Sequence, residues 1–410
     1  MGGVIVANPG GPRHMRWMAT GLAREGLLRA YVTPVAATPA GLRRVERLPG
    51  PISSRLGREL SLRDLPPDVA PGQAITAATM PELLQVAIRR SPLPWGIKSE
   101  ALRLRSVAFD KRVARLLKAG DLAVIAASNS ALATLLSAGD LGVQAILDYP
   151  IAHHAWAERL LSDEARLQPQ LADTLQLAEL PERTRRRIGD EIEQADRILL
   201  LTSFQRQTFI ESGVEEEKLT VIPLGVEIDA FRPAPREEDR PFRVLFAGQL
   251  TQRKGLSYAL EGFRKAAIPG AELILVGPVV GSGRPWRGMS GVRQVGRIPF
   301  GDLPSQFQAC DVFLLPSLVE GLPQTLLEAM ACGLPVVVSE NTAGPEVVAD
   351  GSQGYVVPIR DPDSIAERLL ELYDNPERRR TMGAEARRRA EELSGDTYGL
   401  RIAEALRGAD

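Results

Sequence analysis

Short apolar runs alternate with longer stretches of helical periodicity along the first half of the chain. The runs predict strands at residues 4–7, 29–34, 123–127, 144–149 and 196–203. Apolar residues three and four positions apart predict helices at residues 13–24, 100–118, 130–138, 160–194 and 204–212. Residues 36–98 are rich in Pro, Gly and Arg and give no clear pattern. Strands that alternate with helices in this way indicate a parallel α/β sheet.

The same alternation begins again after a polar, Pro-bearing stretch at residues 232–240. Strands are predicted at residues 243–248, 272–277, 292–298, 311–316, 334–339 and 354–359. Helices are predicted at residues 256–265, 323–333 and 376–407, with another beginning after Asp361. The pattern therefore predicts two α/β domains, at residues 1–225 and 241–385, joined by a linker at residues 226–240.

Length and composition agree with two globular domains. A chain of 410 residues is too long for one ordinary core, and 44% of its residues are hydrophobic. No apolar run approaches the ~20 residues that a membrane span needs, and the start lacks the shape of a signal peptide, so a cytoplasmic location is expected. Cys310 and Cys332 are interpreted as small buried residues, and three histidines outside any ligand cluster predict no zinc site.

Charge is unevenly distributed, although the formal net charge is only −1. Between residues 40 and 120, fifteen Lys and Arg residues face seven Asp and Glu residues. Two interpretations stay open: helices with solvated Arg faces, or a surface that contacts an anionic membrane or a diphosphate-linked acceptor. Few aromatic residues lie between these charges, so a nucleic-acid partner is not expected.

The stretch 315–333 carries the clearest candidate chemistry. A buried strand ends at Pro316, a polar turn follows, and Pro323 suits the first position of a helix that Gly333 ends. Unpaired backbone N–H groups at a helix start can bind an anion. Glu320 lies beside that turn and Glu328 about two helical turns later, which suits a ligand with phosphates and hydroxyls, such as a nucleotide sugar. The alternative is an ordinary strand, turn and helix with two solvated glutamates.

Three other segments join this candidate site. Arg253 and Lys254 stand at a predicted helix start after Gly248, where two positive charges and the helix dipole favour a diphosphate. His153 and His154 follow a predicted strand, at the edge where open α/β sheets bind ligands, although a histidine that caps the next helix is the alternative. The glycine loop after the first strand is not G-x-G-x-x-G, so it does not predict a dinucleotide site.

Several motifs together resemble a known family. E-G-L-P-Q-T-L-L-E, from Glu320 to Glu328, resembles the E-x7-E signature of the retaining glycosyltransferases of family 4. Residues 248–255 are similar to the family's G-x-L-x-x-x-K-G element, and residues 222–231 to its I-P-x-G-V-x-x-x-x-F segment. Gly10 and Gly11 match its Gly-Gly loop, while Gly344 and Glu346 approximate its G-x-x-E one residue tighter.

The resemblance implies the GT-B fold, an α/β fold with two Rossmann-like domains that face one another across a cleft. It also implies that a tail at about residues 386–410 crosses back to the first domain. The residues that it implies in catalysis are Glu320, His154, His153, Lys254 and Arg253. Those that it implies in donor binding are Gly10, Gly11, Gly248, Gln249, Arg253, Lys254, Glu320, Gly321, Leu322, Pro323, Gln324, Thr325 and Glu328.

The implied reaction moves a sugar from a UDP- or GDP-sugar to a saccharide or lipid-linked acceptor, with retained anomeric configuration, in polysaccharide or glycoconjugate synthesis. Arg253, Lys254 and the backbone of residues 322–324 would stabilise the leaving diphosphate. No convincing Asp-x-Asp motif is found, so neither a metal nor another cofactor is expected. The location implied is cytoplasmic, with peripheral contact at the inner face of the membrane as one possibility. The alternatives are a GT-B nucleotide-sugar epimerase and a non-catalytic protein that binds sugar nucleotides.

Overall fold

The computed structural model describes residues 2–10, 13–36, 65–91, 93–175, 180–235, 240–342, 344 and 346–408. By its contacts the chain divides into two units. Unit 1 comprises Met1–Tyr149, Glu182–Leu199 and Tyr398–Asp410, and unit 2 comprises Pro150–Pro181 and Leu200–Thr397. The domain limits predicted at residues 225 and 240 come from the sequence pattern, whereas the two units are defined by contacts in the structure. The predicted limits therefore stay a prediction.

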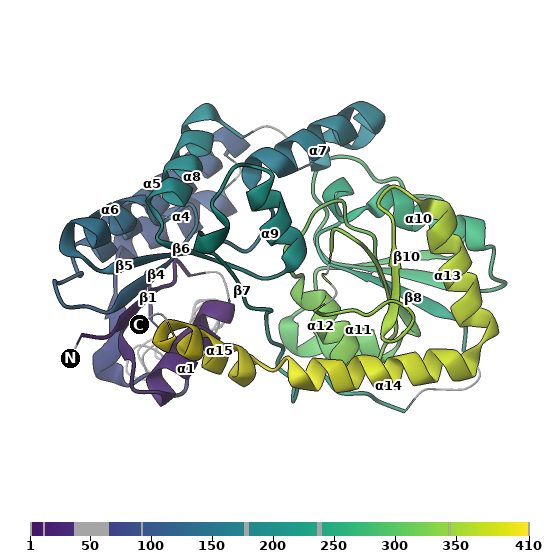
Figure 1. The fold of residues 1–410 in the computed structure, drawn as a ribbon. Helices are drawn as coiled ribbons and strands as arrows, with labels where there is room; N and C mark the ends of the chain where they lie inside the picture. The colour runs from purple at the N-terminus through teal and green to yellow at the C-terminus, as the bar shows by residue number, and fades with distance from the viewer. Residues whose placement is uncertain are drawn as a thin grey trace, which may run out of the picture. The chain divides into compact units, whose positions relative to one another are not determined.

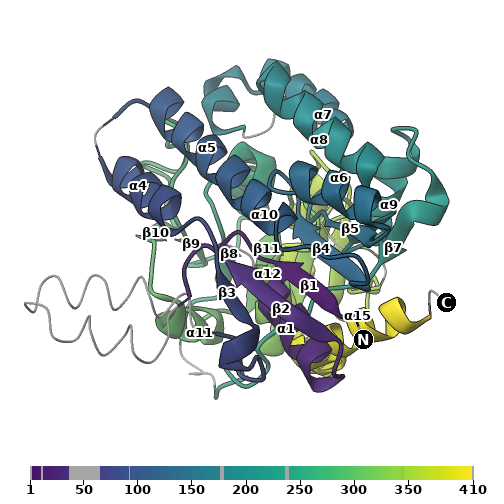
Figure 2. The same cartoon turned by 90° about the vertical axis from the view of Figure 1, so that its left-hand side faces the viewer.

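Unit 1 is built on a parallel sheet (Figures 1 and 2). The sheet has the strand order β3-β2-β1-β4-β5-β6-β7. Its strands are β1 (Val4–Ala7), β2 (Leu28–Thr33), β3 (Ala74–Thr76), β4 (Ala123–Ala127), β5 (Gln144–Asp148) and β6 (Arg197–Leu200). The last strand of the sheet is β7 (Leu219–Val221), which the contacts assign to unit 2. The central strands β1 and β4 are wholly buried, which explains why they appear in the sequence as continuous apolar runs.

Helices cover both faces of the unit 1 sheet. They are α1 (His14–Arg24), α4 (Thr79–Arg90), α5 (Trp95–Ala114), α6 (Leu132–Leu141), α8 (Glu182–Gln194) and α15 (Gly395–Arg407). Figure 1 shows α5, α6 and α8 over one face and α1 with α15 over the other. A Cβ on Gly21 of α1 would lie 2.2 Å from the carbonyl carbon of Gly399 in α15, so only glycine permits this close approach of the two helices. The end of the chain is therefore part of unit 1.

Unit 2 has its own parallel sheet, with the order β10-β9-β8-β11-β12-β13. Its strands are β8 (Arg243–Ala247), β9 (Glu272–Val276), β10 (Val292–Gly296), β11 (Val312–Leu315), β12 (Val336–Ser339) and β13 (Gly354–Val357). Its helices are α7 (His154–Leu167), α9 (Ser203–Ile210), α10 (Leu256–Ala266), α11 (Leu303–Gln308), α12 (Gln324–Ala331), α13 (Pro362–Asp374) and α14 (Pro376–Glu392). The order places β8 directly beside β11, so the segments after these two strands leave the same edge of the sheet.

Some predicted elements differ from the structure. The helix predicted at residues 160–194 is wrong as one element, because α7 ends at Leu167 and a 3₁₀ helix (Pro169–Thr174) precedes α8. Pro169 and Pro181 supply the breaks, since proline cannot continue a helix. Within residues 36–98 the structure contains β3, α4 and the start of α5, which the Pro- and Arg-rich composition had obscured. The helical tail is two helices, α14 and α15.

Candidate active site

Two cations and one carboxylate form a buried cluster at the carboxyl edge of the unit 2 sheet. Arg253 and Lys254 lie in a 3₁₀ turn (Gln252–Lys254) after β8, and Glu320 follows β11. Arg253 Nη1 and Lys254 Nζ each lie 2.8 Å from Glu320 Oε1. All three residues are at most 8% exposed. The sheet order thus joins residues that are 66 or more positions apart in the sequence.

The electrostatics of this cluster follow from its burial. Burial alone would raise the pKa of the Glu320 carboxyl, but the charges of Arg253 and Lys254 outweigh that effect and lower it. Burial also lowers the pKa of the Lys254 ammonium, and Glu320 opposes that shift. Two cations face one carboxylate, so one positive charge is not balanced within the cluster. A diphosphate that entered here would meet an excess of positive charge.

Backbone hydrogen bonds hold the cluster in place. Arg253 Nη1 donates to the Val319 carbonyl at 2.9 Å, and the Leu318 amide donates to the Arg253 carbonyl at 2.8 Å. Asn341 accepts from the Glu320 amide through its carbonyl and donates from Nδ2 to Leu318. The cluster is therefore organised before any ligand binds, as a site that stabilises developing charge requires.

Gly248 provides the space in which the Lys254 side chain lies. Its φ is 141°, in the region that favours glycine, and a Cβ there would lie 3.1 Å from Lys254 Cε. Gln249, the next residue in the predicted donor-binding set, is half-buried.

The turn before α12 presents unpaired amides. Pro323 is the N-cap rather than the first helical residue, and it has no backbone N–H, so the donors predicted at residues 322–324 are corrected to exclude it. Within the described part of the chain, the N–H groups of Leu322, Gln324 and Thr325 donate no hydrogen bond. Such amides at a helix start are suited to an anion.

The neighbours of that turn are also defined. Gly321 packs on the segment before α7, because a Cβ there would lie 2.1 Å from the Pro150 carbonyl oxygen. Glu328 is buried on α12 at 6% exposure. Burial, with the Glu328 charge nearby, raises the pKa of the Cys332 thiol to about 12, so this cysteine stays a neutral thiol. Cys310 is buried as well.

The two histidines differ in their surroundings. His153 is the N-cap of α7, where its Nδ1 accepts from the Ala155 amide at 3.3 Å, and its ring packs edge-on against Phe209. Burial and the adjacent His154 lower the pKa of His153 to about 3, so its ring is neutral at pH 7. His153 thus performs the capping role that was the alternative in the sequence.

In unit 1 the glycine loop lies beside a buried histidine–carboxylate pair. Gly10 has a φ of 91°, and its amide donates to Asn8 Oδ1 at 2.9 Å. His14 Nε2, in the first residue of α1, lies 2.8 Å from Asp148 Oδ2 at the end of β5. Gly11 lies outside the described residues.

Glu346, which the motif comparison names, accepts from the Ser203 amide at the start of α9 through its Oε1 at 2.7 Å. Sequence reasoning missed two other polar residues. Asn341 is one, and its place in a predicted turn gave no sign that it would hold Glu320. The second is Glu164 in α7, which is fully buried. A charged residue on the apolar face of a predicted helix is the only sequence signal that could have indicated it.

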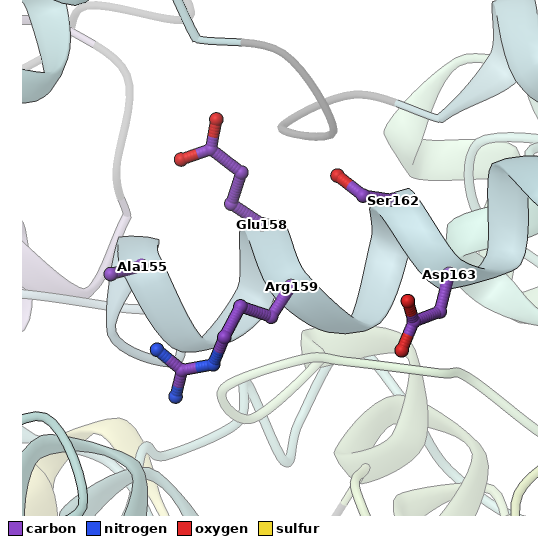
Figure 3. Close-up of a pocket in the computed structure, with 5 residues that line it drawn as sticks. All are labelled: Ala155, Glu158, Arg159, Ser162 and Asp163. Carbon is purple, nitrogen blue, oxygen red and sulfur yellow. The ribbon is translucent and has the colours of Figure 1, made fainter.

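The outer surface of α7 lines an open hollow of about 510 Å3 (Figure 3). Its lining residues are Ala155, Glu158, Arg159, Ser162 and Asp163. Figure 3 shows the side chains of Glu158 and Ser162 on one side of the helix and those of Arg159 and Asp163 on the other. Four of these five residues are polar or charged, and none of them belongs to the predicted site.

Two further observations bear on metals and membranes. Across the described ranges, no group of three or more His, Cys, Asp and Glu side chains could hold a metal ion. None of the helices there is both long and apolar enough to span a bilayer.

Part of the chain is similar to a known protein family. Residues 227–389 match the family model described as glycosyl transferases group 1. A GDP-mannose-dependent monoacylated alpha-(1-6)-phosphatidylinositol monomannoside mannosyltransferase from Corynebacterium glutamicum is 30% identical over 250 residues, which are 54% of this chain. The match spans 64% of that relative, less than two thirds of its length.

Solved structures match over the whole chain. Anabaena HepE in complex with UDP has a TM-score of 0.63 at 16% identity, with complete coverage of both chains. Sucrose-phosphate synthase from Thermosynechococcus elongatus has a TM-score of 0.64 at 18% identity, and the match covers 100% of this chain and 99% of that one. At these identities the likeness shows the fold. The GT-B fold expected from the motifs is confirmed, and residues 227–389 resemble the group 1 glycosyl transferases.

Proposed function

We propose that this chain is a retaining glycosyltransferase that moves a sugar from a nucleoside-diphosphate sugar to a saccharide or lipid-linked acceptor. The observation that carries the proposal is the buried cluster of Arg253, Lys254 and Glu320, two cations against one carboxylate. Unpaired amides at the start of α12, which follows the same edge of the sheet, add to its attraction for an anion. The family of residues 227–389 supports the same reaction class.

In this proposal the cluster acts on the leaving group. Departure of a nucleoside diphosphate develops negative charge, and fixed cations and amides stabilise that charge most when water is excluded. Arg253 and Lys254 contact the diphosphate without a metal. Glu320 is then released to accept hydrogen bonds from the sugar hydroxyls and to stabilise the oxocarbenium-like state, and Glu328 accepts from the ribose hydroxyls.

The remaining predicted residues have roles around the sugar. His154 contacts the sugar hydroxyls or the acceptor, because His153 is occupied as a helix cap. Gly10 and Gly11 keep the donor-binding role that the resemblance implies for them. The leaving phosphate takes the proton of the acceptor hydroxyl on the same face of the sugar, so the configuration is retained.

The test is a thermal-shift series with UDP, GDP, ADP and NAD, first without and then with a divalent metal. A ligand at 100 times its dissociation constant stabilises the folded state by about 2.7 kcal/mol. We expect either UDP or GDP to raise the midpoint without metal, and that result names the donor class. The proposal would be overturned if only NAD raised the unfolding midpoint, or if none of the nucleotides did.

Activity assays then separate the alternatives. Transfer of sugar from the UDP- or GDP-sugar to a saccharide or lipid-linked acceptor, with the product anomer assigned by NMR, is the expected result. An epimerase would convert the donor in the absence of any acceptor. A non-catalytic binding protein would show the thermal shift without turnover.

A second observation supports contact with a membrane surface. Met80, Leu83 and Leu84 of α4 are 74%, 49% and 62% exposed, and their spacing places them on one helix face. Helix α5 packs on α4 (Figure 2). Its residues Ile97 and Leu104 are exposed too. Lys111 and Arg112 near the end of α5 are also exposed. Apolar residues together with basic ones suit an anionic bilayer.

We therefore propose that the protein works at the cytoplasmic face of a membrane, where a lipid-linked acceptor would be presented. Sedimentation with vesicles of phosphatidylglycerol and phosphatidylcholine tests this. Wild type should sediment with the anionic vesicles, and the Leu83→Asp/Leu84→Asp variant should stay in solution. Equal sedimentation of both proteins would refute the surface assigned to α4.

A further inference from the structure

A fully buried carboxylate on α7 collects donors from three separate parts of unit 2. Glu164 Oε1 accepts from Gln252 Nε2 at 2.7 Å and from the Tyr258 hydroxyl at 2.8 Å. Its Oε2 accepts from Arg360 Nε at 2.7 Å. The residues that line the hollow on the same helix are half-buried or exposed, whereas Glu164 is 0% exposed. An ionised group buried this deeply is retained only when it is paired and hydrogen-bonded, as here.

Gln252 transmits this arrangement to the basic cluster. It immediately precedes Arg253 and Lys254 and is itself 0% exposed. Besides the bond to Glu164, its Oε1 accepts from the Ser257 amide at 3.0 Å. Its own amide donates to Thr174 Oγ1 at 2.9 Å, from the 3₁₀ helix that follows α7. The turn that carries the two cations is therefore held on one side by α10 and on the other by α7 and its continuation.

Arg360 shows a second sign of constraint. Its φ is 60°, a left-handed conformation that is sterically unfavourable for a residue with a side chain. The side chain donates to Glu164 and, through Nη2, to the Leu160 carbonyl at 3.2 Å. Backbone strain of this kind persists where the surrounding contacts fix it, and such positions concentrate near functional sites.

Tyr258 completes the set as a donor. Burial and the hydrogen bond to Glu164 raise the pKa of the Tyr258 hydroxyl, so that hydroxyl keeps its proton and donates it to the carboxylate. The Glu164 carboxylate thus has donors on both oxygens, and all of them belong to unit 2.

We infer that Glu164 is a positioning residue for diphosphate binding: through Gln252 it holds the turn of Arg253 and Lys254 in the geometry in which both cations meet Glu320. The inference rests on the proposed function for its ligand, a nucleoside diphosphate. Glu164 acts on the two cations indirectly, through its hydrogen bond with Gln252. Residues that fix the groups of a binding site in this manner typically affect binding or activity about tenfold when they are replaced.

The test compares Glu164→Gln with a matched control, Asp311→Asn. Asp311 also forms a buried ion pair, with Arg240 at 2.7 and 3.0 Å, but it precedes β11 and so lies at the opposite end of that strand from Glu320. Glutamine has the same size as Glu164, but its side-chain NH2 group would face one of the three side chains that donate hydrogen bonds to the Glu164 carboxylate. That hydrogen bond would be lost. We expect Glu164→Gln to weaken UDP or GDP binding about tenfold, while Asp311→Asn lowers stability without changing nucleotide affinity.

Amide hydrogen exchange gives a readout that needs no nucleotide. The Lys254 and Gly255 amides donate to the Thr251 and Gln252 carbonyls within the turn. Glu164→Gln should speed exchange in a peptide covering residues 251–255 about tenfold, and Asp311→Asn should leave it unchanged. If Glu164→Gln does not fold, Tyr258→Phe, which removes one donor to Glu164, should still speed exchange in the same peptide.

The outcomes separate the two proposals. Unchanged exchange at residues 251–255 in the Glu164 and Tyr258 variants overturns the positioning inference, whether or not wild type binds a nucleotide. Faster exchange together with unchanged nucleotide affinity also overturns the inference, because greater mobility of the turn would then have no effect on nucleotide binding. Failure of wild type to bind UDP or GDP overturns the proposed function, and the positioning role in diphosphate binding with it.

Discussion

Replacement of Glu320 by glutamine gives the sharpest test of the buried cluster. Glutamine preserves the shape of the side chain but removes the negative charge that faces Arg253 and Lys254. Both cations are buried, at 8% and 7% exposure, and each lies 2.8 Å from the carboxylate. The variant therefore leaves two buried cations without their counter-ion.

The size of the effect follows from that burial. Removal of one partner of a buried ion pair typically destabilises a protein by about 3–5 kcal/mol. At about 2–4 °C per kcal/mol for a domain of this size, a loss of about 3 kcal/mol lowers the unfolding midpoint by about 6–12 °C. A nucleoside diphosphate supplies the missing negative charge, so UDP or GDP should raise the midpoint of the variant by more than it raises that of wild type.

The assay is differential scanning fluorimetry of wild type and Glu320→Gln with and without the nucleotide, followed by a transfer assay. Glu367→Gln, on an exposed position of α13, is the control for the chemical change alone. We expect Glu320→Gln to be less stable, to gain more from the nucleotide and to transfer no sugar. Equal midpoints for wild type and variant, or a smaller nucleotide shift in the variant, would refute the electrostatic reasoning.

Three further predictions test other parts of the site. Lys254→Ala should abolish sugar transfer while the protein stays folded, whereas the control Lys265→Ala, at the partly exposed end of α10, should keep its activity. A transfer assay with radiolabelled donor measures activity, and circular dichroism checks that each variant is folded. An active Lys254→Ala variant would show that Lys254 is not part of the site. Gly321→Ala should destabilise the protein by about 1–3 kcal/mol because of the contact with Pro150, while Gly189→Ala in α8, with open space around it, should be neutral or stabilising in the same urea titration. The lowered pKa of Glu320 stabilises the folded state above the ordinary carboxyl pKa of about 4.3, and this contribution is lost as the pH falls. The difference in the free energy of unfolding between wild type and Glu320→Gln should therefore become smaller below about pH 4. A difference that stays constant as the pH falls would contradict the lowered pKa of Glu320.

Much of the fold could be predicted from the sequence because it depends on local patterns. Buried parallel strands must be apolar along their whole length, and β1, β4 and β11 therefore appeared as uninterrupted runs. Asp361 was predicted to start a helix, and its carboxylate accepts from the Asp363 and Ser364 amides at the start of α13. At residues 79–90 the Pro- and Arg-rich composition obscures the apolar periodicity, so no helix is predicted there, although the structure has α4.

The candidate site also has features that local sequence patterns predict and features that depend on tertiary contacts. Sequence patterns predict Arg253, Lys254 and Glu320 as residues with suitable chemistry, because helix starts, glycine turns and charged side chains are local features. The sequence could not determine that Glu320 neutralises both cations, that His153 is a helix cap, or that Glu164 joins residues 88 to 196 positions away. Those contacts depend on which strands become neighbours, here β8 beside β11, and on which donors a buried carboxylate finds once the chain has folded. Local periodicity decides the elements, whereas the partners of buried polar groups are decided only by tertiary packing, since each such group must find a partner to offset its loss of water.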